Sequence, residues 1–210
     1  MPLKFYYSPM SSADVTRAVI AELEHGQSEP LAETVNVKIT EGEAKTETFL
    51  SKVNPNGLVP VIVHDGVTIW ESAAITIYLG ETFGVDRKVE GVRTPLFPEA
   101  GTLRGEAMKW IVWPNLHLAA HTLPLHDGQP PEIKALESRS RADITKSLCV
   151  LNGALEGRDY LLGSEYTLAD THVWSFVGYM TMCKFELSKT PNVEAWFKRV
   201  SSRPQLKALK

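Results

Sequence analysis

The chain has 210 residues, of which 43% are hydrophobic and 22% charged, the balance of an ordinary globular protein with one large or two small domains. A formal net charge of −3 gives no electrostatic reason to bind nucleic acid, and no long apolar run predicts a membrane span. Cys149 and Cys183 form no C-x-x-C pair, and the first residues lack a signal peptide's apolar core, so we expect a cytoplasmic protein.

Strand and helix patterns alternate over the first quarter of the chain. The sequence predicts a strand over 3–7, a turn over 8–12, a helix over 14–25, a strand over 33–39 and a short helix over 46–53. Val15, Val19 and Leu23 give the first helix its apolar spacing, and Gly26 ends it. A right-handed crossover through this helix makes the two strands parallel.

The segment over 54–72 reads NPNGLVPVIVHDGVTIWES and begins with a turn. Asp65 and Gly66, between two apolar runs, predict a two-residue hairpin that adds antiparallel strands. Pro60 cannot donate to a strand ladder, so it belongs at the mouth of the first of these strands. A cis bond before Pro60 would turn the Val59 backbone outward.

The same segment has the features of a small binding site. The backbone before Pro60 offers unpaired N–H and C=O groups to an extended peptide, as in strand addition. Ser72, at the start of a helix predicted over 72–83, offers a hydroxyl and helix N–H groups to an anion. Glu71 beside it is placed to hold an ammonium group. The plain alternative is a hairpin and a helix cap without a ligand.

Strand signals stop in the second half of the chain. Charges, glycines and prolines over 83–98 predict a linker, and helical periods follow over 99–125, 132–155, 191–201 and 204–209. T-L-A-D at 167–170 is a capping-box pattern that opens another helix, so we interpret Thr167 and Asp170 as structural residues. The six histidines are scattered without ligand spacing, which predicts no metal site.

N-P-N-G-L-V-P-V-I followed by W-E-S-A-A-I resembles the glutathione-binding segment of cytosolic glutathione transferases of serine type, theta-, phi-, beta- or zeta-like. The resemblance implies that the Val59 backbone, before a cis Pro60, pairs with the cysteinyl part of glutathione. It also implies that Glu71 and Ser72 hold the γ-glutamyl end. Many family members have glutamine where this chain has Leu58, which affects a side-chain contact but not the backbone contact.

The order of the predicted elements is similar to that of the same family. The resemblance implies an α/β thioredoxin-like N-terminal domain with a mixed four-stranded sheet over 1–82, which binds glutathione. A linker over 83–98 would lead to an all-α helical-bundle C-terminal domain over 99–210, which holds the electrophile. The end of the chain also matches, in Pro191, Trp196, Val200, Arg203 and Pro204.

The turn after the first strand is where thioredoxin-like folds carry their reactive group. A helix N-terminus stabilises negative charge there, but this turn has no cysteine, so its hydroxyls would instead donate to the thiolate of bound glutathione. Several related classes place the reactive residue five positions before an Arg or His of the first helix, which selects Ser12, before Arg17. Ser11 is the alternative and Tyr7 a third candidate, and both serines could also be plain helix caps.

A basic residue before the 54–57 turn is a further candidate. Related classes use one there to bind the glycyl carboxylate of glutathione, and this chain has Lys45 and Lys52. We favour Lys45, although a solvated lysine fits the pattern equally well.

Aromatic residues line one face of the predicted helix over 99–125. Trp110, Trp113 and His117 fall at i, i+3 and i+7, a stripe that is more often core than site. In the family that the sequence resembles, this helix forms one wall of the electrophile pocket. The resemblance therefore assigns Trp113 and His117 to that wall, with Tyr7 and Met10 opposite.

The implied function is that of an enzyme, a glutathione transferase that activates the thiol of glutathione as thiolate for attack on an electrophilic small molecule. Glutathione would be a co-substrate, without a permanently bound cofactor. We expect a hydrophobic electrophile, a homodimer, a role in detoxification, and no nucleic-acid or membrane partner. The alternatives are a glutathione-dependent peroxidase, isomerase or dehalogenase on the same site, or a non-catalytic transferase-like interaction module.

Overall fold

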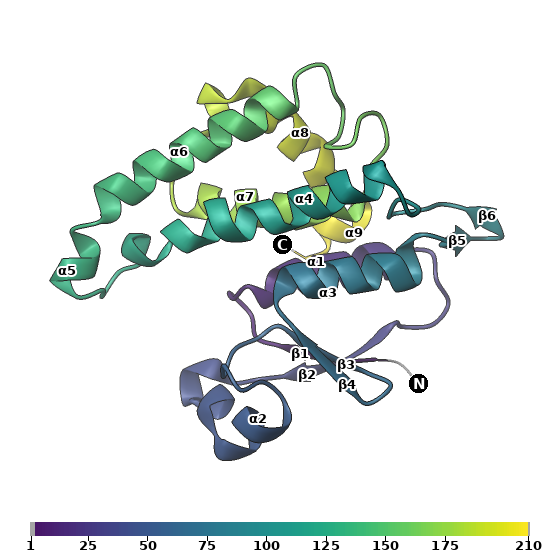
Figure 1. Cartoon of the computed structure of the whole chain (residues 1–210), viewed down its shortest axis with the longest axis horizontal. Coiled ribbons are helices and arrows are strands. Elements are labelled where there is room, and N and C mark those ends of the chain that lie inside the picture. Colours follow the sequence, from purple (N-terminus) through teal and green to yellow (C-terminus); the bar gives the residue numbers. More distant parts are fainter. Residues whose placement is uncertain (1–2, 210) are drawn as a thin grey trace.

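The computed structural model describes residues 3–209, which form a sheet-containing first part and a helical second part (Figure 1). The sheet has four strands in the order β2-β1-β3-β4. Its strands are β1 Leu3–Tyr7, β2 Ala32–Asn36, β3 Val61–His64 and β4 Val67–Trp70. β1 and β2 are parallel, whereas β3 is antiparallel to both β1 and β4, so the predicted mixed four-stranded sheet is confirmed.

Helices cover both faces of this sheet (Figure 1). α1 Ala13–Glu24 and α3 Ser72–Leu79 lie between the sheet and the helical part, and α2 Glu47–Lys52 lies on the other face. α1 buries Val15, Val19 and Leu23, the residues whose spacing predicts it. The second strand is shorter than predicted, because the chain leaves the sheet after Asn36 and forms two 3₁₀ turns, Ile39–Glu41 and Glu43–Lys45.

The segment between β2 and α3 has the turns that its sequence predicts. The hairpin reverses at Asp65 and Gly66, both with positive φ (48° and 78°), as a tight two-residue turn requires. The peptide bond between Val59 and Pro60 is cis, which confirms the prediction. Glu71, between β4 and α3, also has a positive φ of 73°, so the chain turns sharply just before the helix begins.

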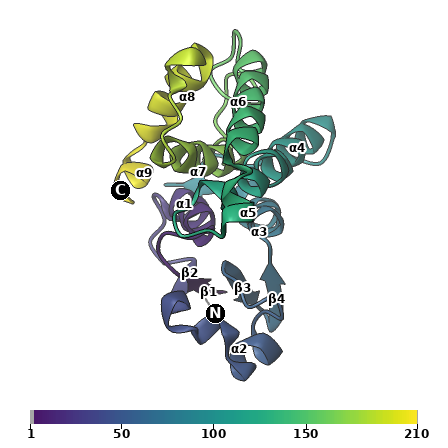
Figure 2. The same cartoon turned by 90° about the vertical axis from the view of Figure 1, so that its left-hand side faces the viewer.

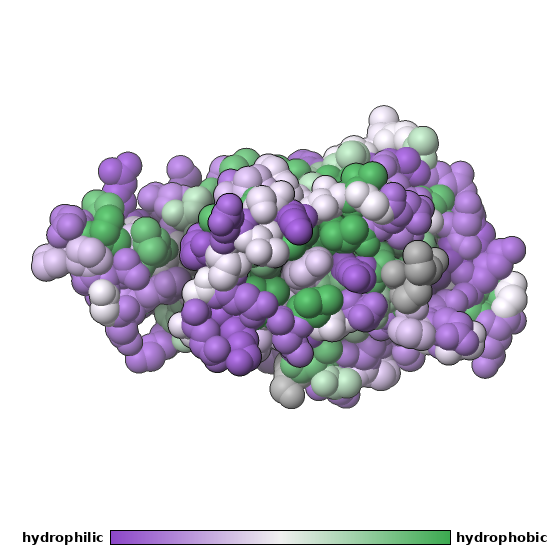
Figure 3. Space-filling view, turned by 90° about the horizontal axis from the view of Figure 1, so that it is seen from below, coloured by the Kyte–Doolittle hydropathy of each residue, from purple (hydrophilic) through white to green (hydrophobic). Residues whose placement is uncertain are grey.

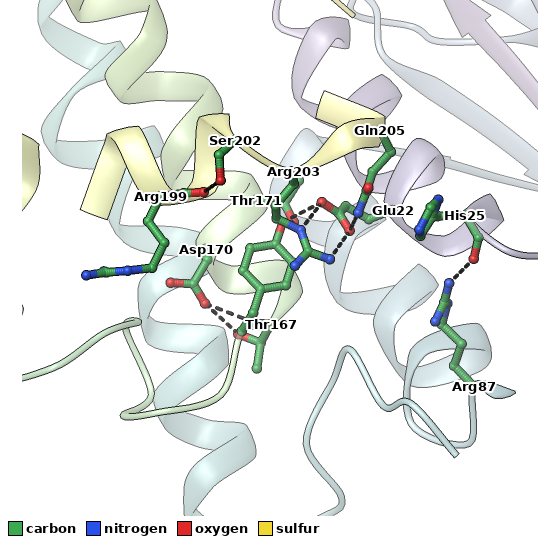
Figure 4. A network of polar contacts seen from close by, with 11 residues as sticks. Glu22, His25, Arg87, Thr167, Asp170, Thr171, Arg199, Ser202, Arg203 and Gln205 are labelled. Carbon is green, nitrogen blue, oxygen red and sulfur yellow. Dashed lines mark hydrogen bonds and ion pairs between the residues drawn. The ribbon is translucent and has the colours of Figure 1, made fainter. Parts of the chain in front are cut away.

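The connection between the two parts contains a small hairpin that the sequence did not predict. α3 ends in a π-helical turn, Gly80–Gly84, and then β5 Lys88–Val89 pairs with β6 Val92–Arg93. Arg87 attaches this connection to the end of α1, since its guanidinium donates to the backbone oxygens of Leu23 and His25 (Figure 4) and to the Thr94 hydroxyl. The connection is therefore an ordered segment.

The second part is all-helical, as predicted. Its helices are α4 Thr102–His117, α5 Pro131–Lys134, α6 Glu137–Ala154, α7 Leu168–Met182, α8 Pro191–Ser201 and α9 Pro204–Lys207. The helix expected over 99–125 ends at His117, and two short 3₁₀ turns continue it. α7 is the central helix, because it packs against α1, α4 and α8 and most of its residues are buried.

One hydrophobic core joins the two parts. It extends from the sheet through α1 and α3 into α4, α7 and α8. Figure 2 shows α1 and α3 lying between the sheet and the helical part, and α1 packs on α7 while α3 packs on α4. The faces of α1 and α3 that meet the second part are therefore held in a fixed position relative to α7.

The surface matches the composition. Seen from below, most of it is hydrophilic, with small apolar areas between polar side chains (Figure 3). Within residues 3–209, no helix has the length and apolar character needed to cross a bilayer. The same residues contain no group of three His, Cys, Asp or Glu side chains with the geometry to hold a metal ion.

Candidate active site

The turn after β1 gives its two serines different partners. The Ser11 hydroxyl donates to the Ser8 carbonyl at 2.7 Å and accepts from the Ala13 N–H at 3.2 Å, so it caps the start of α1. The Ser12 hydroxyl donates to the Val59 carbonyl at 3.0 Å and makes no cap. Of the two serines, Ser12 is the one that reaches the segment around the cis-proline.

The third hydroxyl candidate, Tyr7, is held by α1. Its phenol donates to Asp14 Oδ1 at 2.9 Å, and the Arg17 guanidinium lies 5.2 Å from the centre of its ring. Burial raises the pKa of Tyr7, and the hydrogen bond to the Asp14 carboxylate raises it further. The phenol is therefore a neutral group whose proton is already donated, which disfavours it as the residue that ionises a thiol.

The loop before β3 is held in an open conformation. Asn54 is buried, and its side-chain amide donates to the Leu58 carbonyl at 2.9 Å and accepts from the Asn56 N–H at 3.0 Å. The Leu58 side chain is 56% exposed, whereas the Val59 side chain is buried and anchors the loop. The hydrogen bonds found within residues 3–209 include none from the Val59 N–H. One backbone donor at this edge is thus free for a ligand.

Lys45 lies against the same loop. Its Nζ donates to the backbone oxygen of Asn56 at 3.1 Å, and the side chain is otherwise exposed to solvent. Lys52 is exposed in the last turn of α2. The ammonium group of Lys45 is therefore fixed beside the 54–58 loop, where a carboxylate could reach it.

The other end of the site is the start of α3. Glu71 is exposed and directly precedes the first turn of the helix, while Ser72 is buried, with 4% of its surface exposed. The Ser72 Oγ accepts a hydrogen bond from Asn115 Nδ2 at 3.0 Å, so a residue of α4 supports it. An acid, a hydroxyl and the positive end of a helix thus lie together, a set suited to an amino acid's ammonium and carboxylate groups.

A cavity of ≈ 770 Å³ adjoins the turn after β1. The first part contributes residues that include Tyr7, Met10, Ser11 and Ser12, and the helical part contributes mainly residues of α7. The α7 residues in the lining are Trp174, Ser175, Phe176, Gly178, Tyr179, Thr181 and Met182. Met10 is 74% exposed and has a positive φ of 58°, so its side chain stands at the edge of the cavity.

Two family models match the chain, one to each part. That of the glutathione S-transferase N-terminal domain matches residues 1–81, and that of the C-terminal domain matches residues 112–204. The chain belongs to the glutathione transferase family.

Similarity to other glutathione transferases extends over nearly the whole chain. Glutathione S-transferase D6 of Drosophila melanogaster is 29% identical over 197 residues, which are 90% of this chain and 83% of that one. The solved structure of glutathione transferase F7 from Populus trichocarpa is 27% identical, with a TM-score of 0.78 over 99% of this chain and 97% of that chain. A possible glutathione S-transferase from Rhodopseudomonas palustris is 26% identical, with a TM-score of 0.79 over 97% and 87%.

Two of the residues expected in the electrophile pocket of this transferase lie elsewhere. Trp113 and His117 stack on each other at 5.8 Å along the outer side of α4, in a separate shallow depression. The buried face of α4 instead contains Trp110, Ile111 and Pro114. Successive helical residues are about 100° apart, so Trp113 lies about 60° from Trp110 around the helix axis, on the side away from Ile111 and Pro114. Trp113 and His117 therefore do not line the cavity beside the turn after β1.

The sequence interpretation also missed the α7 side of the transferase's cavity. This side includes Tyr179, whose hydroxyl is hydrogen-bonded to the His126 ring. Burial, together with the neighbouring Cys183, raises the pKa of Tyr179 to about 12, so its phenol stays protonated at neutral pH. Ser175, Tyr179 and Met182 recur at i, i+4 and i+7, a signal that could have identified a second face of this helix.

Proposed function

We propose that this transferase binds glutathione along the 58–60 and 71–72 segments and ionises its thiol beside Ser12, for attack on an apolar electrophile in the cavity. One observation carries the proposal: the Ser12 hydroxyl lies 3.0 Å from the Val59 carbonyl, the group expected to pair with the cysteinyl residue. The hydroxyl and the backbone edge therefore converge on one point, where the thiol of that cysteinyl residue would lie.

Each charged end of glutathione has a complementary group along this edge. The free Val59 N–H and its carbonyl would pair with the cysteinyl backbone, as in strand addition. Glu71 would hold the γ-glutamyl ammonium and Ser72 its carboxylate. Lys45 would hold the glycyl carboxylate, and Leu58 and Pro60 would flank the tripeptide. Glutathione is the co-substrate in this proposal, without a permanently bound cofactor.

The energy needed to ionise the thiol is modest. A thiol has a pKa near 8.5, and lowering it by about two units takes about 2.7 kcal/mol. When glutathione binds, its cysteinyl N–H can donate to the Val59 carbonyl in place of the Ser12 hydroxyl. The Ser12 hydroxyl can then turn to donate to the sulfur. One hydrogen bond to a charged group is worth about 1.5–3 kcal/mol, and the N-terminus of α1 adds about 0.3–1 kcal/mol. Ser11 is a weaker candidate because its hydroxyl already caps α1.

The composition of the cavity supports a hydrophobic electrophile. Its apolar lining includes Trp174, Phe176 and Met182 of α7 and Met10 of the first part. Most of the hydroxyls in the wall donate to backbone carbonyls, as in Ser175 to Thr171. An apolar molecule with an electrophilic atom would displace water from this wall and place that atom near the thiolate. The two reactants would then react while bound side by side, without a further bimolecular encounter.

We also propose a homodimer, because apolar side chains are exposed on one side of the molecule. Figure 2 shows β4, α3 and α4 on that side. The exposed apolar residues of β4 and α4 are Val67, Trp70, Leu103, Val112 and Leu116. A second copy would cover them, and Trp113 and His117 would then belong to the interface. Light scattering should give twice the chain mass, and Leu116→Glu should shift it toward the monomer.

The test of the function combines binding with turnover. Calorimetry should detect glutathione binding to the wild type, weakened about tenfold or more in Glu71→Ala and Ser72→Ala, since hydrogen bonds to charged groups are worth about 1.5–3 kcal/mol. The matched control, Glu186→Ala, removes an exposed acid from the helical part and should leave the affinity unchanged. Turnover of a chlorinated nitroaromatic should require glutathione. Unchanged affinity in both site variants would exclude this binding mode, and binding without turnover of any electrophile would favour an interaction module.

A further inference from the structure

A chain of four polar side chains crosses the boundary between the two parts and ends at Ser72. Thr76 of α3 is hydrogen-bonded to His172 Nδ1 at 2.9 Å, and His172 Nε2 to Asn115 Oδ1 at 3.0 Å. Asn115 Nδ2 donates to Ser72 Oγ at 3.0 Å. This hydrogen-bond chain thus runs from α3 to α7, from α7 to α4, and from α4 back to the first residue of α3.

The direction of every hydrogen bond in this chain is determined. Asn115 donates to Ser72 through its nitrogen, so its oxygen faces His172 and can only accept. His172 must then carry its proton on Nε2, and its bare Nδ1 must accept from the Thr76 hydroxyl. At the other end, Ser72 accepts from Asn115, so its own O–H is left to donate outward. All donors point from Thr76 toward Ser72.

The surroundings of His172 keep it in the required form. The ring is completely buried, and this burial lowers the pKa of His172 to about 3. The imidazole is therefore neutral at physiological pH, with one donor and one acceptor nitrogen. A protonated ring would carry a proton on Nδ1 as well. The Thr76 hydroxyl could then no longer donate to this nitrogen.

We propose that Asn115 and His172 are positioning residues that hold Ser72 as a hydrogen-bond donor toward the γ-glutamyl carboxylate of glutathione. The inference rests on the proposed function, since Ser72 is the group assigned to that carboxylate. Its consequence is that α4 and α7, which belong to the electrophile-binding part, set the affinity of the anion site in the first part. A hydroxyl free to rotate would instead divide its time between accepting and donating orientations.

The first test examines the hydrogen-bond chain directly, in the protein without glutathione. Nitrogen-15 NMR of the imidazoles in the free protein should show His172 as the neutral Nε2–H tautomer, and Asn115→Leu should alter its shifts. An Nδ1–H tautomer would reverse the hydrogen bonds and overturn the proposal. This measurement is independent of catalysis, so it stands even if the protein fails to bind glutathione, a result that would instead count against the proposed function.

The second test asks whether Asn115 acts through Ser72. Calorimetry should show that Asn115→Leu weakens glutathione binding about tenfold, while in the Ser72→Ala background the same change should have no further effect. A glutathione analogue without the γ-glutamyl α-carboxylate should bind wild type and Asn115→Leu equally. If Asn115→Leu weakens the analogue as much as glutathione, or adds its full effect to Ser72→Ala, Asn115 acts in another way and the proposal fails.

Conservative and control variants separate positioning from packing. His172→Gln keeps an N–H donor and a carbonyl acceptor in one side chain and should retain near wild-type affinity, whereas His172→Phe should lose about as much as Asn115→Leu. Thr171→Val removes a buried hydroxyl one residue away on α7, where it is bonded to Tyr166, and should not change the affinity. Equal losses in His172→Gln and Thr171→Val would mean that disturbed packing is the cause. If His172→Phe does not fold, the comparison of Asn115→Leu with His172→Gln still decides between the two explanations.

Discussion

At the scale of single residues, the pair Ser11 and Ser12 shows how position decides chemistry. Both are serines in one turn, but the Ser11 hydroxyl bonds its neighbours Ser8 and Ala13, while the Ser12 hydroxyl bonds Val59, far away in the sequence. A hydroxyl used as a cap stabilises a helix, and one that faces the ligand edge can stabilise a thiolate. The two roles predict that substitution of Ser11 lowers stability, whereas substitution of Ser12 lowers the rate of the reaction.

Ser12→Ala should lower kcat/KM at neutral pH by roughly tenfold to a hundredfold, the value of one hydrogen bond to a charged sulfur. Glutathione affinity should change little, because in the proposed binding mode the 58–60 and 71–72 segments would provide most of the binding. The loss should shrink as pH rises, since the thiol then ionises without help above its own pKa of about 8.5. The measurement is the pH profile of kcat/KM.

Ser11→Ala is the matched control for this profile. It should cost about 1 kcal/mol of stability as a lost cap and leave the profile in place. If Ser11→Ala moves the profile upward and Ser12→Ala does not, Ser11 is the catalytic serine. If neither moves it, the thiolate is stabilised by another group, such as a backbone N–H.

His172 should make the protein sensitive to mild acid. Burial holds its folded pKa at about 3, below the unfolded value of 6.5, so the unfolded chain binds more protons between these values and stability is lost as pH falls. The loss should be about 2 kcal/mol between pH 7.5 and pH 5. Urea unfolding at the two pH values should show it in the wild type and in the surface variant His25→Gln, but not in His172→Gln. Equal losses in all three would mean that another group is responsible.

At the scale of elements, α7 is the helix on which the second part is organised. Asp170 lies in its first turn and accepts four hydrogen bonds: two from Thr167, through its N–H and hydroxyl, one from the Leu161 N–H and one from the Trp196 indole. It thereby connects α7 to the preceding loop and to α8. A capping box explains only the bonds to Thr167.

Asp170→Ala should therefore cost more than a helix cap alone. A lost cap is worth about 1 kcal/mol, and leaving the buried Leu161 N–H and Trp196 indole without an acceptor adds about 1–3 kcal/mol for each. We expect a total of at least about 3 kcal/mol in urea unfolding, with glutathione affinity unchanged in the protein that remains folded. Asp170→Asn, which keeps one carbonyl oxygen, should cost less. A wild-type melting temperature together with lost binding would move Asp170 into the site.

At the scale of the whole molecule, a buried ion pair attaches the C-terminal segment to the first part. Glu22 of α1 is fully buried and accepts from Arg203 Nε at 2.7 Å and from its Nη2 at 2.8 Å. Tyr166 and Gln205 also donate to the Glu22 carboxylate, and the Arg203 guanidinium lies 3.6 Å from the centre of the Tyr166 ring. Figure 4 shows the Arg203 and Gln205 side chains converging on Glu22.

Arg203→Met should destabilise the protein by about 3–5 kcal/mol, because it leaves the Glu22 carboxylate buried and without its counter-charge. The double variant Glu22→Leu/Arg203→Met should recover most of that loss. Arg199→Met, which removes an exposed pair with Asp159, should cost at most about 1 kcal/mol. Chemical unfolding measures all three. A double variant as unstable as the single one would show that hydrogen bonding to Glu22 by its three partner residues, not the uncompensated charge, sets the cost.

The sequence by itself determined the features that depend on neighbouring residues. The hairpin turn at Asp65 and Gly66 and the capping box of α7 were predicted, because turns and caps are set by a few adjacent side chains. The cis bond before Pro60 was expected from the family resemblance. The parallel pairing of β1 and β2 followed from the strand–helix–strand pattern, since a crossover has one favoured hand. The mixed four-stranded sheet was implied by the family resemblance. The family resemblance supplied the candidate residues of the glutathione site.

The tertiary structure decided which side chains meet across long separations. Only the packed chain brings the Ser12 hydroxyl to Val59, and only it connects Ser72 to His172 through Asn115. The aromatic stripe of α4 could not reveal its own orientation, because helical spacing defines a face but not the partner that covers it. The cavity is formed where α1 and α7 pack together, so its lining depends on the relative placement of two helices that local patterns leave open.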